Sequence, residues 1–264
     1  MDGPEAVRRL AVVSLLFAMP AVATMQKKPV SWTLGEATYE GVLVWDDASK
    51  TPRPGLVMVP NWLGVTEAAV KQAIEVAGSK YVVLVADVYG VASRPKDRDE
   101  AGKRSGALKA NRPELRARMA KALEVLLAQT KAAPLDGKKV GAIGFCFGGT
   151  AVLELARSGA SVAGVVSFHG GLSSPKPEDA KAIMARVLVL HGADDPSVPP
   201  DEVRAFEDEM RAAKVDWQLV SYGNTVHSFT DPAANMPGRA QYNAPVAKRA
   251  FRAMNEFFGE LFGG

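Results

Sequence analysis

The stretch VGAIGFCFGG (140–149) runs from apolar residues into the only cysteine of the chain and leaves through two glycines. Its centre, GFCFG (144–148), fits the G-x-nucleophile-x-G pattern of a sharp turn between a strand and a helix, with cysteine in place of the usual serine. Small residues are needed two positions either side because the strained turn leaves no room for side chains. Such a turn places the sulfur at a helix N-terminus, where the thiolate is favoured.

Cys146 therefore has two interpretations. In the first it is a nucleophile, and the backbone N–H of Phe147 points at the oxyanion that forms when a carbonyl is attacked. In the second it is a small hydrophobic residue of the core, an ordinary place for an unpaired cysteine. Because the chain has one cysteine, an internal disulfide is excluded. The choice depends on whether a nucleophile finds partners elsewhere in the sequence.

Apolar runs rich in Val, Leu and Ile flank the turn and predict a sheet around it. Several of these runs are apolar almost throughout, as in parallel strands that are covered on both faces. The expected strands are 37–45, 55–60, 81–89, 139–145, 162–170, 186–192 and 217–222. The expected helices are 66–79, 112–130, 147–157, 201–213 and about 243–262.

Strands and helices alternate from residue 55 onward, which implies right-handed crossovers and a mostly parallel sheet. The segment at about 31–46 is expected to form an antiparallel ribbon at the edge of this sheet. The sequence shows no repeat, low-complexity tract or linker, so we expect 24–264 to form one α/β domain with helices on both faces of the sheet.

The composition is that of an ordinary globular protein. Of 264 residues, 47% are hydrophobic and 23% charged, and the net charge of +3 comes from scattered basic residues. The densest charged stretch, SRPKDRDEAGKR (93–104), mixes both signs. We interpret it as a solvated loop and expect no nucleic-acid partner.

The N-terminus has the features of an export signal. Arg8 and Arg9 precede LAVVSLLFAMPAVA (10–23), an uncharged apolar run of 14 residues that ends in small residues acceptable to a signal peptidase. The run is shorter than the roughly 20 residues of a membrane span, and Pro20 interrupts it. We expect a cleaved signal peptide at 1–23, a periplasmic or secreted protein and no stable membrane span after cleavage. The alternatives are an uncleaved anchor and a buried first helix.

Two later loops supply partners for Cys146. An α/β-hydrolase orders its triad as nucleophile, acid and histidine. VLVLHGADDPSVP (187–199) ends a strand in two aspartates, and SYGNTVHSFTDP (221–232) carries a histidine after the last strand. Loops that follow successive parallel strands meet at one sheet edge, where such sheets bind ligands. We favour Asp195 as the acid over Asp194, which is expected to cap or close the turn.

The chain has three histidines, so each can be considered. His227 follows the acid in sequence and lies in a loop, and we expect it to be the base. His169 and His191 each end a strand, and we expect them to be packing or hydrogen-bonded residues. A metal site needs clustered ligands at short spacing, which these histidines do not provide.

At this point the sequence resembles the dienelactone hydrolase family over about 36–262. GFCFGG (144–149) matches the family's G-[FY]-C-x-G-G turn, DPSVP (195–199) its acid loop, VHSF (226–229) its G-H-[SA]-F loop, and ADVYG (86–90) its D-[LM]-Y-G motif. The resemblance implies an α/β-hydrolase fold and a hydrolase of carboxylic esters or lactones without a cofactor. It assigns Cys146 as nucleophile, His227 as base and Asp195 as its orienting acid.

The resemblance also assigns residues around the triad. The oxyanion donors would be the backbone N–H groups of Phe147 and of Trp62, and Asn61, Tyr89 and Arg94 would lie at the substrate. The family has a glutamate at the place of Asn61, where it takes part in activating the thiol. Asn cannot accept a proton, so His227 would have to generate the thiolate directly.

A second departure concerns the substrate. The family clamps an anionic lactone with two arginines, at places that here hold Val91 and Asp231. Arg94 is close enough in sequence to replace the first, but an acid in the second place would repel an anion. A neutral ester, lactone or acyl thioester is therefore expected at least as much as dienelactone itself. We expect a monomer.

Two further functions have to be weighed. An idle fold retained to bind a small molecule would account for Asn61 and the altered clamp. A redox-reactive thiol is the other, but Cys146 has no second cysteine to resolve it.

Overall fold

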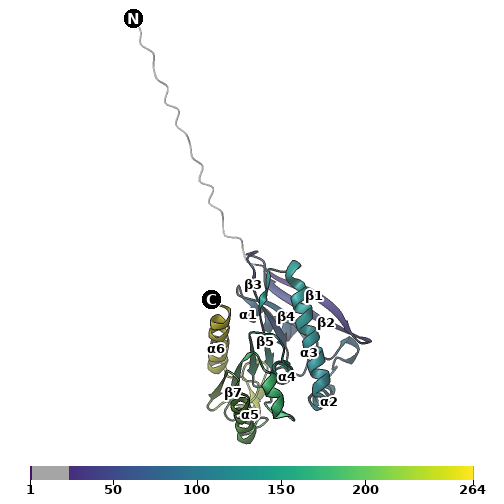
Figure 1. Cartoon of the computed structure of the whole chain (residues 1–264), viewed down its shortest axis with the longest axis vertical. Helices are drawn as coiled ribbons and strands as arrows, with labels where there is room; N and C mark the ends of the chain where they lie inside the picture. Colours follow the sequence, from purple (N-terminus) through teal and green to yellow (C-terminus); the bar gives the residue numbers. More distant parts are fainter. Residues whose placement is uncertain (2–23, 264) are drawn as a thin grey trace.

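The computed structural model describes residue 1 and residues 24–263, so the expected signal peptide lies outside the described residues. An eight-stranded sheet runs through the described part (Figure 1). In the order in which they lie across it, the strands are β1 (Met25–Leu34), β2 (Ala37–Asp46), β4 (Val82–Val85), β3 (Arg53–Val59), β5 (Leu135–Phe145), β6 (Gly164–Phe168), β7 (Arg186–Gly192) and β8 (Trp217–Tyr222).

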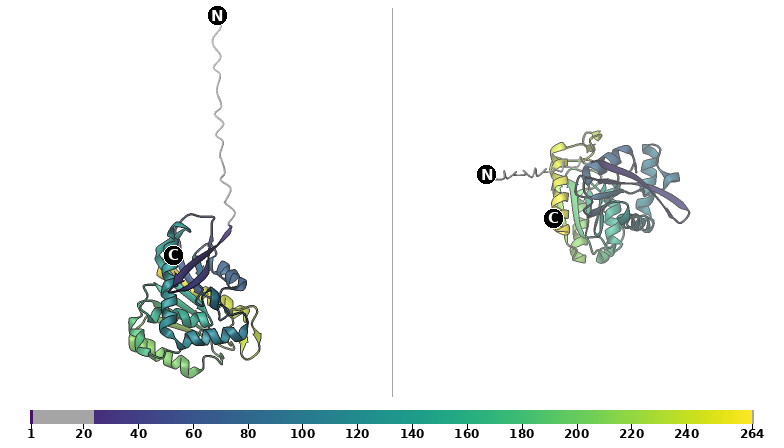
Figure 2. Two further views of the ribbon diagram at one scale, coloured as in Figure 1. Left: turned by 90° about the vertical axis from the view of Figure 1, so that its right-hand side faces the viewer. Right: turned by 90° about the horizontal axis from the view of Figure 1, so that it is seen from above.

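Strands β4, β3, β5, β6, β7 and β8 pair parallel with one another in that order. Strands β1 and β2 pair antiparallel, and β2 also pairs antiparallel with β4. This confirms the mostly parallel sheet and the antiparallel ribbon at its edge, drawn in purple in Figure 2. The ribbon begins at Met25, earlier than expected, and pairs without a break from Met25–Asp46 to Leu34–Ala37. The start of its first strand, 25–30, was not predicted because its polar residues hide the apolar alternation.

Helices cover both faces of the sheet, as predicted (Figures 1 and 2). Residues of α1 (Glu67–Ala77) and α6 (Ala244–Phe262) enter the apolar core on one face. Residues of α2 (Arg98–Ala110), α3 (Arg112–Leu127), α4 (Phe147–Arg157) and α5 (Pro200–Ala213) enter the core on the other. Within the described residues, no helix combines the length and the hydropathy needed to cross a membrane.

Short elements complete the chain. The 3₁₀ helices are η1 (Val91–Ser93), η2 (Ala128–Lys131) and η3 (Pro177–Ala182), and a small hairpin is made of β9 (Asn235–Met236) and β10 (Ala240–Gln241). Of these elements, the hairpin adjoins the site described below, because Ala240 pairs with His227.

The solvated loop expected at 93–104 is wrong for most of that stretch, because α2 begins at Arg98. Asp97 caps the helix by accepting a hydrogen bond from the Glu100 N–H at 2.8 Å, and Glu100 in turn accepts from the Lys96 N–H. The helix buries a narrow row of mostly small residues, Ala101, Ser105 and Leu108. The charged residues on its other faces concealed this row in the sequence.

Candidate active site

The turn that carries Cys146 has the predicted geometry. β5 ends at Phe145, α4 begins at Phe147, and Cys146 between them has φ 54° and ψ −117°. A Cβ atom on Gly144 would lie 1.9 Å from the Gly148 carbonyl oxygen, and one on Gly148 would lie 2.0 Å from the Val59 carbonyl oxygen. Glycine is therefore required at both positions. Cys146 is partly exposed, unlike a residue enclosed in the core.

Cys146, His227 and Asp195 form one hydrogen-bonded line. The Cys146 Sγ lies 3.0 Å from His227 Nε2, and His227 Nδ1 lies 2.7 Å from Asp195 Oδ2. The Asp195 carboxylate is buried, and its other oxygen accepts the Ser197 N–H at 2.8 Å. Asp194 is exposed, and its N–H donates to the Thr225 carbonyl. The structure thus brings together the three residues chosen from the sequence.

The environment of His227 favours its protonated form. Burial lowers the pKa of His227, but the hydrogen bond with Asp195, followed by the hydrogen bond and charge interaction with Cys146, raises that pKa to about 10. At neutral pH the ring is therefore an imidazolium facing the sulfur. An imidazolium in that place stabilises a thiolate and holds a proton ready for a leaving group.

The loop that carries His227 is held by the hairpin that follows it. The His227 carbonyl accepts the Gln241 N–H at 3.0 Å, and the Phe229 carbonyl accepts the Asn243 N–H at 3.1 Å. Asn243 also caps α6 by accepting the Val246 N–H. Sequence reasoning missed this support, since strands of two residues leave no periodic signal.

The two expected oxyanion donors are contacted by one side chain. The Tyr89 hydroxyl donates to the Trp62 carbonyl at 2.9 Å, and the Tyr89 ring stacks on Phe147 with centroids 5.7 Å apart. Burial is the main cause that raises the pKa of Tyr89, so the phenol keeps its proton. Among the described residues, no acceptor takes up the N–H of Trp62 or of Phe147.

Asn61 and Arg94 make contacts of a different kind. The Asn61 side chain accepts the Leu63 N–H at 3.0 Å and so closes the turn that presents Trp62. Arg94 pairs with the buried Asp87 at 3.0 Å and also donates to the Glu40 carbonyl. Neither side chain contacts a member of the triad. Arg94 uses its guanidinium to bind Asp87 and Glu40, which holds the loop after β4.

The remaining histidines lie near the triad. His169 is buried and hydrogen-bonded on both ring nitrogens, one to the Cys146 N–H and one to the Thr230 hydroxyl. His191 is also buried, and its Nδ1 has no hydrogen-bond partner among the described residues. Burial lowers the pKa of both rings. No three His, Cys, Asp or Glu side chains gather into a possible metal site in the described part of the chain.

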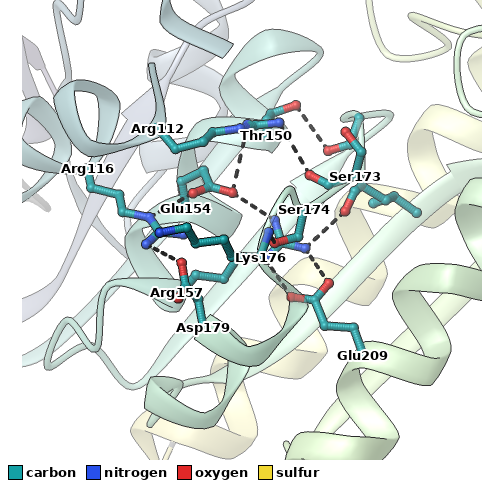
Figure 3. Close-up of polar contacts among 12 residues, drawn as sticks. Arg112, Arg116, Thr150, Glu154, Arg157, Ser173, Ser174, Lys176, Asp179 and Glu209 are labelled. Carbon is teal, nitrogen blue, oxygen red and sulfur yellow. Dashed lines mark hydrogen bonds and ion pairs between the residues drawn. The ribbon is translucent and has the colours of Figure 1, made fainter. Parts of the chain in front are cut away.

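A second set of charged groups, buried or half-buried, lies at the other end of α4 (Figure 3). Arg157 binds Glu209 through two hydrogen bonds of 2.8 and 2.7 Å and donates to Glu154 at 3.0 Å. Arg116 joins Glu154 to Asp179. We call this set, with Arg112, the arginine cluster; its members are Arg112, Arg116, Glu154, Arg157, Asp179 and Glu209.

The arginine cluster holds an irregular segment that follows β6. Arg157 donates to the Leu172 carbonyl at 2.9 Å, and Arg112 to the Ser173 carbonyl at 3.3 Å. Glu202 accepts the N–H groups of both residues, at 2.6 and 3.0 Å. Side chains thus replace the backbone partners that a strand would give this segment.

Comparison with known proteins gives a consistent relationship. The profile of the Dienelactone hydrolase family matches residues 40–262. An uncharacterized protein of Caenorhabditis elegans is 38% identical over 145 residues, which make up 53% of this chain and 92% of that protein. A protein of Escherichia coli K12 named "Putative carboxymethylenebutenolidase" is 25% identical over 224 residues, 82% of this chain and 80% of its own length.

Proteins of Yersinia pestis and Salmonella typhimurium with that name align over 47% and 48% of their own lengths. Among solved structures, a dienelactone hydrolase-like promiscuous phosphotriesterase from metagenomic libraries superposes with a TM-score of 0.83 at 40% identity. The superposition covers 90% of this chain and 98% of that one. Matched over most of its length by the family profile and by this structure, the chain belongs to the dienelactone hydrolase family of α/β-hydrolases.

Proposed function

We propose that this chain hydrolyses carboxylic esters or lactones with Cys146 as the nucleophile. The observation that carries the proposal is the line from the buried Asp195 through His227 to a partly exposed sulfur at the N-terminus of α4. A nucleophile, a base within hydrogen-bond distance and a group that orients the base are the parts that acyl transfer requires.

The reaction follows from this geometry. The Cys146 thiolate attacks the carbonyl carbon, and the oxygen takes the electron pair and becomes an oxyanion between the N–H groups of Trp62 and Phe147. The His227 imidazolium then gives its proton to the departing alkoxide, which leaves a thioester on Cys146. His227, now neutral, takes a proton from water as the water attacks the thioester. The acid product leaves, and the thiolate and the imidazolium are restored.

Thiol activation in this scheme depends on His227 alone. The Asn61 amide cannot accept a proton, and its oxygen already accepts a hydrogen bond from the Leu63 N–H. The hydrogen-bonded distance from His227 to the sulfur allows direct proton transfer, without a relay through a third group.

We further propose that the substrate is neutral. Arg94, the side chain expected to replace the family's first arginine, is paired with Asp87. The second place holds Asp231, a negative charge whose carboxylate accepts the Ala233 N–H in its own turn. An anionic lactone would meet repulsion and no free cation at these positions. Neutral esters, neutral lactones and acyl thioesters avoid this cost.

The same argument supports a second candidate reaction. The similar solved structure is named as a promiscuous phosphotriesterase. A phosphotriester carries no charge, and its attack by Cys146 would develop an oxyanion at the same N–H groups. We therefore propose phosphotriester hydrolysis as a side activity of this site.

A panel of p-nitrophenyl esters with acyl chains of increasing length, together with one aryl phosphotriester, tests these proposals. Turnover in the native protein and its loss in Cys146→Ala are the expected results. Tight binding of an ester without turnover would instead support the ligand-binding alternative. Peroxide-sensitive thiol chemistry without hydrolysis would support the redox alternative.

We also propose that the protein is exported and acts as a monomer in the periplasm or outside the cell. The charged start, the apolar run at 10–23 and the small residues at its end support export. Protein isolated from its native host should begin near Thr24. Mass spectrometry that finds an intact N-terminus on the exported or cytosolic protein would contradict the proposal.

A further inference from the structure

His169 joins the two loops that have to meet for catalysis. Its Nδ1 lies 3.1 Å from the backbone N–H of Cys146, which it shares with the Phe168 carbonyl at 3.0 Å, and its Nε2 lies 2.8 Å from the Thr230 hydroxyl oxygen. Thr230 is three residues after His227, in the same loop. The rings of His169 and His227 also meet edge to face with centroids 5.2 Å apart. One buried side chain therefore contacts the nucleophile's turn and the base's loop.

The two contacts of the His169 ring favour one position for its proton. A Nδ1 that accepts from this N–H group carries no proton, so the geometry favours a ring proton on Nε2 that is donated to Thr230. An imidazolium has no lone pair to accept with, so the bond to Cys146 requires a neutral ring. Burial, and then the neighbouring charge of His227, hold the pKa of His169 well below its usual value. The ring thus stays neutral beside a charged His227.

The backbone around this contact needs outside support. Cys146, His169 and Ser228 all have positive φ, at 54°, 39° and 56°. Residues other than glycine keep such conformations only where surrounding contacts hold them. The turn and the end of β6 are also in backbone contact, since a Cβ atom on Gly170 would lie 2.7 Å from the Gly149 carbonyl carbon. The short distance from the sulfur to His227 depends on these three segments keeping their places.

We propose that His169 is a positioning residue, which acts through Thr230 and the Cys146 N–H to hold His227 against the Cys146 sulfur. The effect on hydrolysis rests on the function proposed above. The prediction is a loss in kcat and in thiolate formation when the bridge is cut, without an equal loss of folding. Such a loss follows because small errors in the position of a catalytic group reduce rates steeply.

Thr230→Val tests the bridge with little change of shape. It removes the hydroxyl that receives the His169 proton, and we expect kcat to fall roughly 10- to 100-fold with KM unchanged. Thr230→Ser keeps a hydroxyl and should restore kcat. His169→Asn tolerates the positive φ and keeps an acceptor for Cys146, so it should lose only the Thr230 half of the bridge and show a loss similar to that of Thr230→Val.

Thr225→Val is the matched control. Thr225 is buried in the same loop, and its hydroxyl bonds Gly223 and Asn243 but not the nucleophile's turn. We expect its kcat to equal that of the native protein. Equal losses in Thr230→Val and Thr225→Val, or in Thr230→Val and Thr230→Ser, would overturn the proposal, as would a loss in proportion to a lowered melting temperature.

A second measurement needs no substrate. The rate of Cys146 alkylation by iodoacetamide, followed against pH, reports the thiolate held by His227. In Thr230→Val this profile should move to higher pH, and in Thr225→Val it should not. If the native protein hydrolyses no ester, the proposed function fails, while the alkylation profiles still decide the role of His169. Identical profiles for all variants would overturn that role.

Discussion

The two ends of α4 hold buried charged groups in opposite ways. At the C-terminal end, Arg157 is fully enclosed and each of its three nitrogens donates to a carboxylate or a carbonyl. At the N-terminal end, the His227 imidazolium faces a partly exposed sulfur, and the Phe147 N–H meets no acceptor among the described residues. At the C-terminal end every Arg157 nitrogen thus has a hydrogen-bond partner, whereas at the N-terminal end the Phe147 N–H is left without one among the described residues.

This difference shows how one helix serves stability and chemistry together. A buried ion pair that is fully hydrogen-bonded is costly to break, because the partner that remains is left charged and unpaired. An unfilled donor at a helix N-terminus is available to an anion that forms during reaction. Changes at the two ends should therefore act on different measurements, namely folding at one end and turnover at the other.

The largest effect is expected from removing the nucleophile. Cys146→Ala should lower turnover by roughly 10⁴- to 10⁶-fold, and His227→Ala by a similar factor, because the members of a triad act as a unit. The double variant should add little to either loss. Cys146→Ala should unfold in urea close to the native midpoint, whereas His227→Ala should unfold earlier because the buried Asp195 carboxylate loses its partner. If the two losses simply multiplied, Cys146 and His227 would not share a mechanism.

At the other end of α4, Arg157→Met is expected to destabilise the fold by about 3–5 kcal/mol, since Glu209 would be left buried without its cation and Glu154 would keep only Arg116 and Arg112. Urea unfolding measures this loss, and kcat of the folded fraction should stay close to native. The matched control is Arg204→Met, whose pair with Asp201 is largely exposed. It should change stability by less than about 1 kcal/mol. Equal losses of stability in the two variants would show that burial of the arginine cluster does not increase its contribution to stability.

The pH dependence of turnover should reveal the raised pKa of His227. The protonated ring is needed to release the alkoxide, so kcat/KM should decline on the alkaline side with a midpoint near pH 10. Because the folded pKa lies above the unfolded value of about 6.5, the contribution of His227 to stability is complete below that pH and is lost through about pH 10. Asp195→Asn removes the strongest stabilising partner and should move the alkaline limb to lower pH. A limb that stays in place would exclude His227 as its origin.

The sequence predicted the parts of the site that are local. The turn at 144–148, the choice of Asp195 over Asp194 and the loop of His227 each follow from a few adjacent residues and their order. The ties between distant segments left no such trace. The bond from His169 to Thr230, the pairing of Arg94 with Asp87 and the clamp on Leu172 and Ser173 depend on which elements pack together, and packing is not encoded at a fixed spacing.

The smallest effect is expected at Asn61, which follows Pro60; the Pro60 carbonyl lies against Gly148 in the first turn of α4. Asn61→Glu brings in the residue of the family but loses the short side chain that accepts the Leu63 N–H. Asn61→Asp keeps that acceptor and adds the same charge, so the pair separates charge from turn geometry.

We expect neither variant to speed the acylation burst with an activated ester, because a carboxylate that reached the sulfur would oppose the thiolate that His227 already stabilises. The cost of enclosing the new charge is about 1–3 kcal/mol. Asn61→Glu should be slower than Asn61→Asp, since it also releases the turn that presents the Trp62 N–H. A burst in Asn61→Glu that is about tenfold faster than native, with stability unchanged, would mean that the thiol is poorly activated at present. The N-terminal end of α4 would then be incomplete without the glutamate, and Asn61 would be a defect of the site rather than part of its design.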